Sequence, residues 1–193
     1  MENSKWARLV SNLLSPPLVW AAVVIPMAFH YAESREQALI WGLIYGVLVC
    51  LVPVLYIFWM VKIGRIGDIH MKERRERFGP FLVSIVSTGL SVLLLVQTGA
   101  PYMLPLVAIF STVQLVIMAL ITLYWQISMH TMSIAGAVVA TGLVFGPASA
   151  LAVSPLVPLV GAARLKLRRH TLAQVIAGIV VGSLIPLMIL SLI

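Results

Sequence analysis

The chain alternates long apolar segments with short polar ones, and this pattern sets the elements that we expect. A stretch of about 20 apolar residues is long enough to cross a bilayer as a helix. The pattern therefore predicts spans over 14–32, 38–61, 80–98, 102–124, 131–145, 150–163 and 171–192. The expected fold class is all-α: a polytopic transmembrane helix bundle of six or seven spans, in a single integral membrane domain over 1–193.

The segment 131–163 is the least regular part of this pattern, because it is too long for one straight crossing and short for two. The run Gly146-Pro147-Ala148-Ser149 predicts a turn that divides it into two short spans. Glycines within the later spans, such as Gly178 and Gly182, are interpreted as positions where helices approach closely.

The composition indicates a membrane protein and argues against a separate soluble domain. Of 193 residues, 61% are hydrophobic and 10% are charged, which lies outside the usual range of soluble domains. Cys50 is the single cysteine, so a disulfide within the chain and a multi-thiolate metal site are excluded. No small-residue cleavage site follows the first apolar run, so we expect a retained first helix rather than a removed signal peptide.

The basic residues gather on one predicted face. Counting crossings places the N-terminus and segments 62–79, 125–130 and 164–170 on that face, while the opposite face carries only Arg35. The positive-inside rule then predicts a cytoplasmic basic face, in an inner or plasma membrane. The same charge would attract anionic lipid headgroups, and it requires no nucleic acid to explain it. The basic residues of this face are Lys5, Arg8, Lys62, Arg65, Lys72, Arg74, Arg75, Arg77, Arg164, Lys166, Arg168 and Arg169.

Three polar clusters occur in these same-face segments, at 67–77, 125–131 and 163–170. Each has an ordinary structural interpretation: a solvated loop, a helix start capped by Ser128 or Thr131, and a cationic loop between two spans. Their order and their shared face are what make them informative together.

In that order, the clusters resemble the three motifs of the type 2 phosphatidic acid phosphatase superfamily, which run Lys-x6-Arg-Pro, Pro-Ser-Gly-His and Ser-Arg-x5-His-x3-Asp. Arg164 and His170 match the third motif, with Ala163 in the serine position and Gln174 in the aspartate position. The motif region covers about 62–182 of the chain.

The two earlier motifs match in part. Ser128 and His130 fall at the serine and histidine of the second motif. Arg77 falls at the arginine of the first, with His70 in the lysine position and Phe78 in the proline position.

The resemblance implies an integral membrane phosphatase that hydrolyses a lipid phosphate or an isoprenoid diphosphate through a phosphohistidine intermediate. By resemblance, His170 is the nucleophile and His130 is the acid that protonates the leaving oxygen. Arg77, Ser128 and Arg164 would bind the substrate phosphate. The resemblance implies neither a metal nor another cofactor.

Two departures from the motifs favour an alternative from a different class. Gln174 is neutral where the family has a carboxylate, and His70 replaces a fixed cation, although Lys72, Arg74 or Arg75 could supply that charge. The alternative is a catalytically silent, phosphatase-like structural subunit or lipid-binding component, with protein partners in a membrane complex. A transporter is less favoured, because the spans lack the buried ionisable residues of a coupling pathway.

Overall fold

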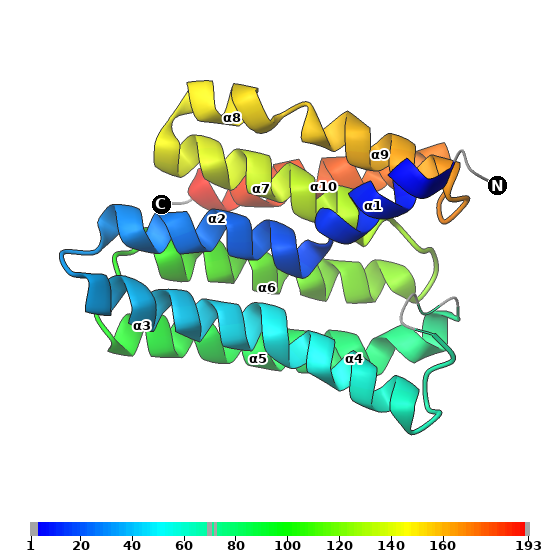
Figure 1. Ribbon diagram of the computed structural model, residues 1–193, viewed down its shortest axis with the longest axis horizontal. Coiled ribbons are helices and arrows are strands. Elements are labelled where there is room, and N and C mark those ends of the chain that lie inside the picture. Colours follow the sequence, from blue (N-terminus) through cyan, green and yellow to red (C-terminus); the bar gives the residue numbers. More distant parts are fainter. Residues whose placement is uncertain (1–3, 69–70, 72, 192–193) are drawn as a thin grey trace. The chain divides into compact units, whose positions relative to one another are not determined.

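The computed structural model of the chain describes residues 4–68, 71 and 73–191 (Figure 1). This described part is helical and contains no strand. The helices are α1 (Lys5–Leu13), α2 (Pro16–Tyr31), α3 (Arg35–Tyr45), the π-helix η2 (Gly46–Leu51), α4 (Val52–Lys62), the 3₁₀ helix η3 (Arg74–Arg77), α5 (Phe78–Gln97), α6 (Met103–Thr122), α7 (Met129–Phe145), α8 (Pro147–Val153), α9 (Leu156–Lys166) and α10 (Leu172–Leu190).

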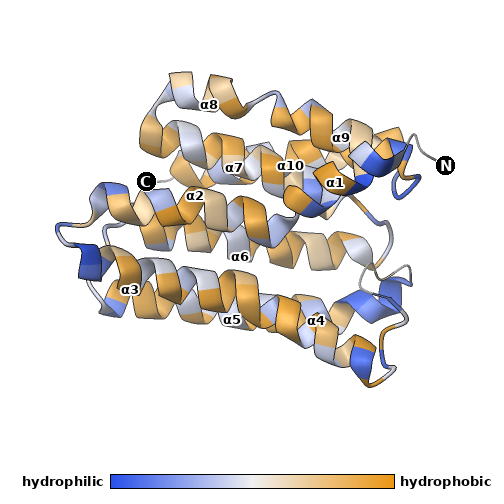
Figure 2. Ribbon diagram, viewed as in Figure 1, coloured by the Kyte–Doolittle hydropathy of each residue, from blue (hydrophilic) through white to orange (hydrophobic). Residues whose placement is uncertain are grey.

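The predicted all-α transmembrane bundle is confirmed. Among the described residues, five helical runs are long and apolar enough to cross a membrane, and a sixth is obtained if α1 and α2, which meet at a bend of 46°, count as one. α7 is shorter, at 17 residues, which is near the lower limit for a crossing. Apolar residues predominate along the helices, as Figure 2 shows. The five runs are Arg35–Lys62, Arg74–Gln97, Met103–Thr122, Pro147–Lys166 and Leu172–Leu190.

The helices form two compact units. Unit 1 comprises Met1–Val23 and Gln126–Ile193, and unit 2 comprises Val24–Trp125, so the boundary between them falls inside α2. The single membrane domain that we expected from the sequence stays a prediction.

Unit 1 is built around α7. The helix α10 packs along α7, and α8 and α9 run back beside it after a tight turn (Figure 1). Its apolar core is formed by side chains from α2, α7 and α9, and α1 packs against α9. The buried members of that core are Val19, Ile134, Ala137 and Val160.

The expected turn between the two short spans is present, and it is tighter than the four-residue run suggested. α7 ends at Phe145, Gly146 has a φ of +89°, and α8 begins at Pro147. A positive φ suits glycine at a helix end, and proline suits the first turn of the next helix. The helical run that returns beside α7 is interrupted between α8 and α9, because Pro155 has no backbone N–H to donate there.

Two glycines of α10 allow its close contact with α7, as the sequence predicted. A Cβ added to Gly178 would collide with Thr131 Oγ1 and with the carbonyl oxygen of Ser128. A Cβ at Gly182 would collide with the backbone of Met132. The start of α7 therefore packs directly against the backbone of α10. This contact positions Ser128 and Thr131.

Unit 2 packs α5 against α6 and against the continuous run of α3, η2 and α4. The π-helix η2 precedes Pro53, which removes a backbone donor from this run and accounts for the irregular hydrogen bonding there. The buried side chains of Tyr45 and Ser111 lie 3.2 Å apart, oxygen to oxygen, and link α3 to α6 by a hydrogen bond. Polar contacts of this kind stabilise helix pairs in lipid.

Candidate functional site

Residues of the second and third motifs meet at one end of unit 1. The backbone N–H of Ser128, just before α7, donates to the carbonyl oxygen of Gln174 in the first turn of α10, at 3.1 Å. Arg164 lies in the last turn of α9, and the α9–α10 connection is short. Within unit 1, the same-face segments that crossing parity grouped are therefore neighbours in space.

Ser128 is the N-cap of α7. Its hydroxyl accepts a hydrogen bond from the backbone N–H of Thr131 at 3.4 Å, and its side chain is fully buried. Thr131 Oγ1 lies 3.1 Å from the carbonyl oxygen of Ser128 and 3.1 Å from that of Val175. The capping interpretation of Ser128 therefore describes its local structure, and its role as a phosphate ligand stays a prediction.

The start of α10 orients His170 through Gln174. Thr171 is the N-cap, and Gln174 Oε1 accepts from the Thr171 backbone N–H at 2.9 Å while the Thr171 hydroxyl accepts from the Gln174 backbone N–H. The same oxygen lies 3.3 Å from His170 Nδ1. An amide oxygen only accepts hydrogen bonds, so Nδ1 is the donor and the imidazole lone pair lies on Nε2. Gln174 therefore contacts the His170 ring through Nδ1, and its correspondence to the aspartate of the family motif stays a prediction.

Arg164 and His130 meet at a residue that sequence reasoning missed, Ser11. Arg164 Nη1 donates to Ser11 Oγ at 2.8 Å. His130 Nε2 lies 3.1 Å from the carbonyl oxygen of Ser11 and 3.4 Å from its hydroxyl. A carbonyl oxygen only accepts, so His130 carries a proton on Nε2. Guanidinium and imidazole donors therefore converge on one place.

Ser11 belongs to α1, a helix that the apolar pattern did not predict, because the first predicted span begins at residue 14. Ala7 and Ser11, four residues apart, form the buried side of this helix. The signal in the sequence was the period of its polar and apolar residues: Lys5, Arg8 and Asn12 lie on one exposed stripe, and Trp6, Leu9 and Leu13 on another. Figure 2 shows the polar residues of α1 and of the α9–α10 connection at the same end of unit 1.

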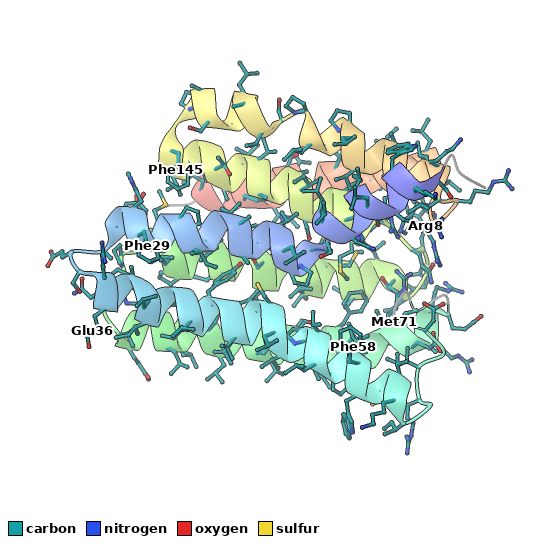
Figure 3. The ribbon with its side chains drawn as sticks, in the orientation of Figure 1. Arg8, Phe29, Glu36, Phe58, Met71 and Phe145 are labelled. Atoms are coloured by element: carbon teal, nitrogen blue, oxygen red, sulfur yellow. The ribbon has the colours of Figure 1, made fainter. Side chains whose placement is uncertain are left out.

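The first motif belongs to unit 2. Arg77 ends η3 and is partly buried, and its Nε donates to the carbonyl oxygen of Met71 at 3.0 Å. Figure 3 labels Met71 in the connection between α4 and α5. His70 and Lys72, the other two predicted site residues of this motif, lie outside the described residues. The phosphate-binding role of Arg77 stays a prediction.

Further contacts shape this connection. The backbone N–H of Gly67 donates to Glu76 Oε1 at 2.7 Å. Arg74 Nη1 donates to the carbonyl oxygens of Leu123 and Tyr124, at 3.2 and 2.9 Å. The connection therefore contacts the residues that follow α6, and within unit 2 the first motif and the approach to the second lie at one end, as parity predicted.

Comparisons of the chain with models of protein families, with curated proteins and with solved structures give no match. The resemblance to the phosphatase superfamily therefore depends on the motif residues alone.

Proposed function

We propose that the chain is an integral membrane phosphatase that hydrolyses a lipid phosphate or an isoprenoid diphosphate through a phosphohistidine. One observation carries the proposal: two histidines and a buried arginine, from three separate segments, gather at one polar end of unit 1. A buried guanidinium and an imidazole donor that both contact Ser11 suit the concentrated negative charge of a phosphate.

In the first step, His170 Nε2 attacks phosphorus, and the bond from phosphorus to the lipid oxygen breaks. The hydrogen bond from Nδ1 to Gln174 supports this step, because it keeps the lone pair on the attacking nitrogen. His130 acts as an imidazolium, protonated on both ring nitrogens; it donates its Nε2 proton to the leaving oxygen and becomes neutral, and the leaving group departs as the lipid alcohol, or as the lipid monophosphate when the substrate is a diphosphate. Arg164 binds the oxygens of the transferred phosphoryl group.

In the second step, water attacks the phosphohistidine and the phosphorus–nitrogen bond breaks. His130, now without its proton, takes one from the water and returns to its starting state. Inorganic phosphate leaves, and His170 regains its lone pair. By the same proposal this end of unit 1 faces the cytoplasm, because the basic residues of the N-terminus and of 164–170 follow the positive-inside rule.

The alternative is a phosphatase-like protein that binds phosphate lipids or partner proteins without turnover. Gln174 favours it, because a neutral amide orients an imidazole and gives a positively charged ring no charge stabilisation. In serine proteases, loss of the comparable carboxylate costs about 10⁴ in rate.

Phosphate release decides between the two functions. The detergent-solubilised full chain is incubated with phosphatidic acid, other lipid phosphates and prenyl diphosphates, beside His170→Ala. Release that is lost in the variant supports the phosphatase. A folded protein that releases phosphate from none of these lipids, but binds them, supports the alternative.

A further inference from the structure

Ser11 supplies two oxygens to the two residues that would meet a substrate phosphate. Its hydroxyl accepts from Arg164 Nη1 at 2.8 Å, and its carbonyl oxygen lies 3.1 Å from His130 Nε2. In the proposed reaction, Arg164 donates to a phosphate oxygen and His130 donates to the leaving oxygen. The neutral oxygens of Ser11 therefore occupy the hydrogen-bonding positions that the reaction requires for oxygens of the substrate.

We infer that α1 is an autoinhibitory helix, and that a phosphate monoester group must displace Ser11 before it reaches Arg164 and His130. The inference rests on the proposed function in one respect: it takes these two residues as the phosphate-binding and acid groups.

Burial agrees with a closed site. Ser11 is 5% exposed and Arg164 is 6% exposed, so α1 separates the guanidinium from solvent and from lipid headgroups. Ala7, one turn earlier on the same side of α1, is fully buried. A headgroup reaches the guanidinium when this side of the helix moves away from α9.

The contact is one that phosphate can replace. Arginine forms bidentate hydrogen bonds with phosphate, and the attraction between opposite charges adds to them, so the guanidinium prefers phosphate oxygens to the single neutral hydroxyl of Ser11. α1 is also separated from α2 by a bend of 46°, next to Pro16 and Pro17, which begin the next helix. The bend provides a point about which α1 moves, and the movement withdraws Val10 from the apolar core of unit 1.

The exposed stripes of α1 suit a helix that stays at the membrane surface after release. Trp6, Leu9 and Leu13 are 39%, 60% and 60% exposed. The polar stripe, Lys5, Arg8 and Asn12, is exposed as well, and Figure 3 labels Arg8. A short helix with one apolar and one basic side lies in the interface between lipid and water, where anionic headgroups are concentrated.

Hydrogen–deuterium exchange of residues 5–13 tests the inference in the detergent-solubilised full chain. The protein is titrated with dioctanoyl phosphatidic acid in one arm and with inorganic phosphate in the other. We expect the α1 amides to exchange faster as phosphatidic acid is added. Faster exchange with inorganic phosphate as well would identify the phosphate group alone as the displacing agent. Unchanged exchange across both titrations would overturn the inference.

A charge variant gives the matched comparison. Ser11→Asp places a carboxylate against Arg164, which should keep α1 protected during the titration and lower phosphate release about tenfold. Asn12→Asp adds the same charge on the exposed stripe and should behave as the unmodified chain does. Release and exchange in Ser11→Asp equal to those in Asn12→Asp would contradict the inference.

Ser11→Ala serves if Ser11→Asp fails to fold. It removes the hydroxyl that Arg164 contacts, so it should exchange faster in α1 than Asn12→Ala does, and should lower the KM for the lipid phosphate. Equal exchange in these two variants would overturn the inference.

The exchange measurement separates this inference from the proposed function. If phosphatidic acid releases α1, Ser11→Asp suppresses that release and the protein hydrolyses none of the lipids, the result supports the autoinhibitory helix and rejects the phosphatase. If the protein hydrolyses a lipid phosphate while exchange in α1 is the same with and without phosphatidic acid, the result supports the phosphatase and rejects the autoinhibitory helix.

Discussion

The side chain of Gln174 holds His170, with 3.3 Å between Gln174 Oε1 and His170 Nδ1. The same oxygen completes a capping box with Thr171, so the residue that orients the imidazole is also part of the helix start. The first residue to change is therefore Gln174, because a carboxylate there would keep both contacts and add a charge.

Gln174→Glu should raise the rate of phosphate release at least about tenfold, since a carboxylate stabilises a positively charged imidazole where an amide does not. Glutamate is a usual third residue of a capping box, so α10 should keep its start. Steady-state phosphate release measures the effect, with Gln97→Glu, an exposed change of the same kind, as the control. An unchanged or lower rate in a folded Gln174→Glu protein would remove Gln174 from the mechanism.

Arg164→Ala and His170→Ala should each abolish hydrolysis while the protein stays folded, because one removes the phosphate-binding guanidinium and the other the nucleophile. Lys166→Ala, an exposed change two residues after Arg164, should matter far less. Phosphate release and thermal unfolding are measured together for all three. An equal loss of activity in the three variants would contradict the roles assigned here.

Arg77→Ala tests the first motif. We expect the KM for a lipid phosphate to rise about tenfold or more, because a charge-assisted hydrogen bond to phosphate is lost. Arg75→Ala, an exposed change in the same 3₁₀ helix, is the control. A KM for Arg77→Ala equal to that of Arg75→Ala would exclude Arg77 from substrate binding.

The order and type of the long apolar helices could be predicted from the sequence, because apolar length alone determines which segments cross a membrane, whereas the short helix α1 was not predicted. The later segments also agree, including the division of 131–163 into α7 and the α8–α9 pair. Local irregularities were not predicted. The π-helix η2 depends on hydrogen bonding around Pro53, and the apolar pattern does not register it.

Only those residues of the candidate site that belong to a motif could be predicted from the sequence. Matching residues selected His130, Arg164 and His170, and within unit 1 their segments lie together. Ser11 could not be found in this way, because it belongs to no motif and contacts Arg164 from 153 positions away. Only the packing of α1 against α9 brings it there.

Gly178→Ala should destabilise the protein, because a Cβ there would collide with the start of α7 at Thr131 and Ser128. We expect a loss of about 1–3 kcal/mol in the free energy of unfolding, as for overpacked cores. Gly89→Ala is the matched control, since no atom lies within 4 Å of a Cβ added there. Thermal unfolding in detergent measures both, and equal stability of the two variants would contradict the close packing of α7 against α10.

In the proposed reaction, His170 becomes phosphorylated. The most direct measurement is a rapid alkaline quench of the full chain during turnover of a lipid phosphate, followed by peptide mass spectrometry. We predict one phosphoryl group on the peptide that contains His170 and none on any peptide of His170→Ala. A protein that releases phosphate while every histidine stays unmodified, or that carries the phosphoryl group on another residue, would contradict the account.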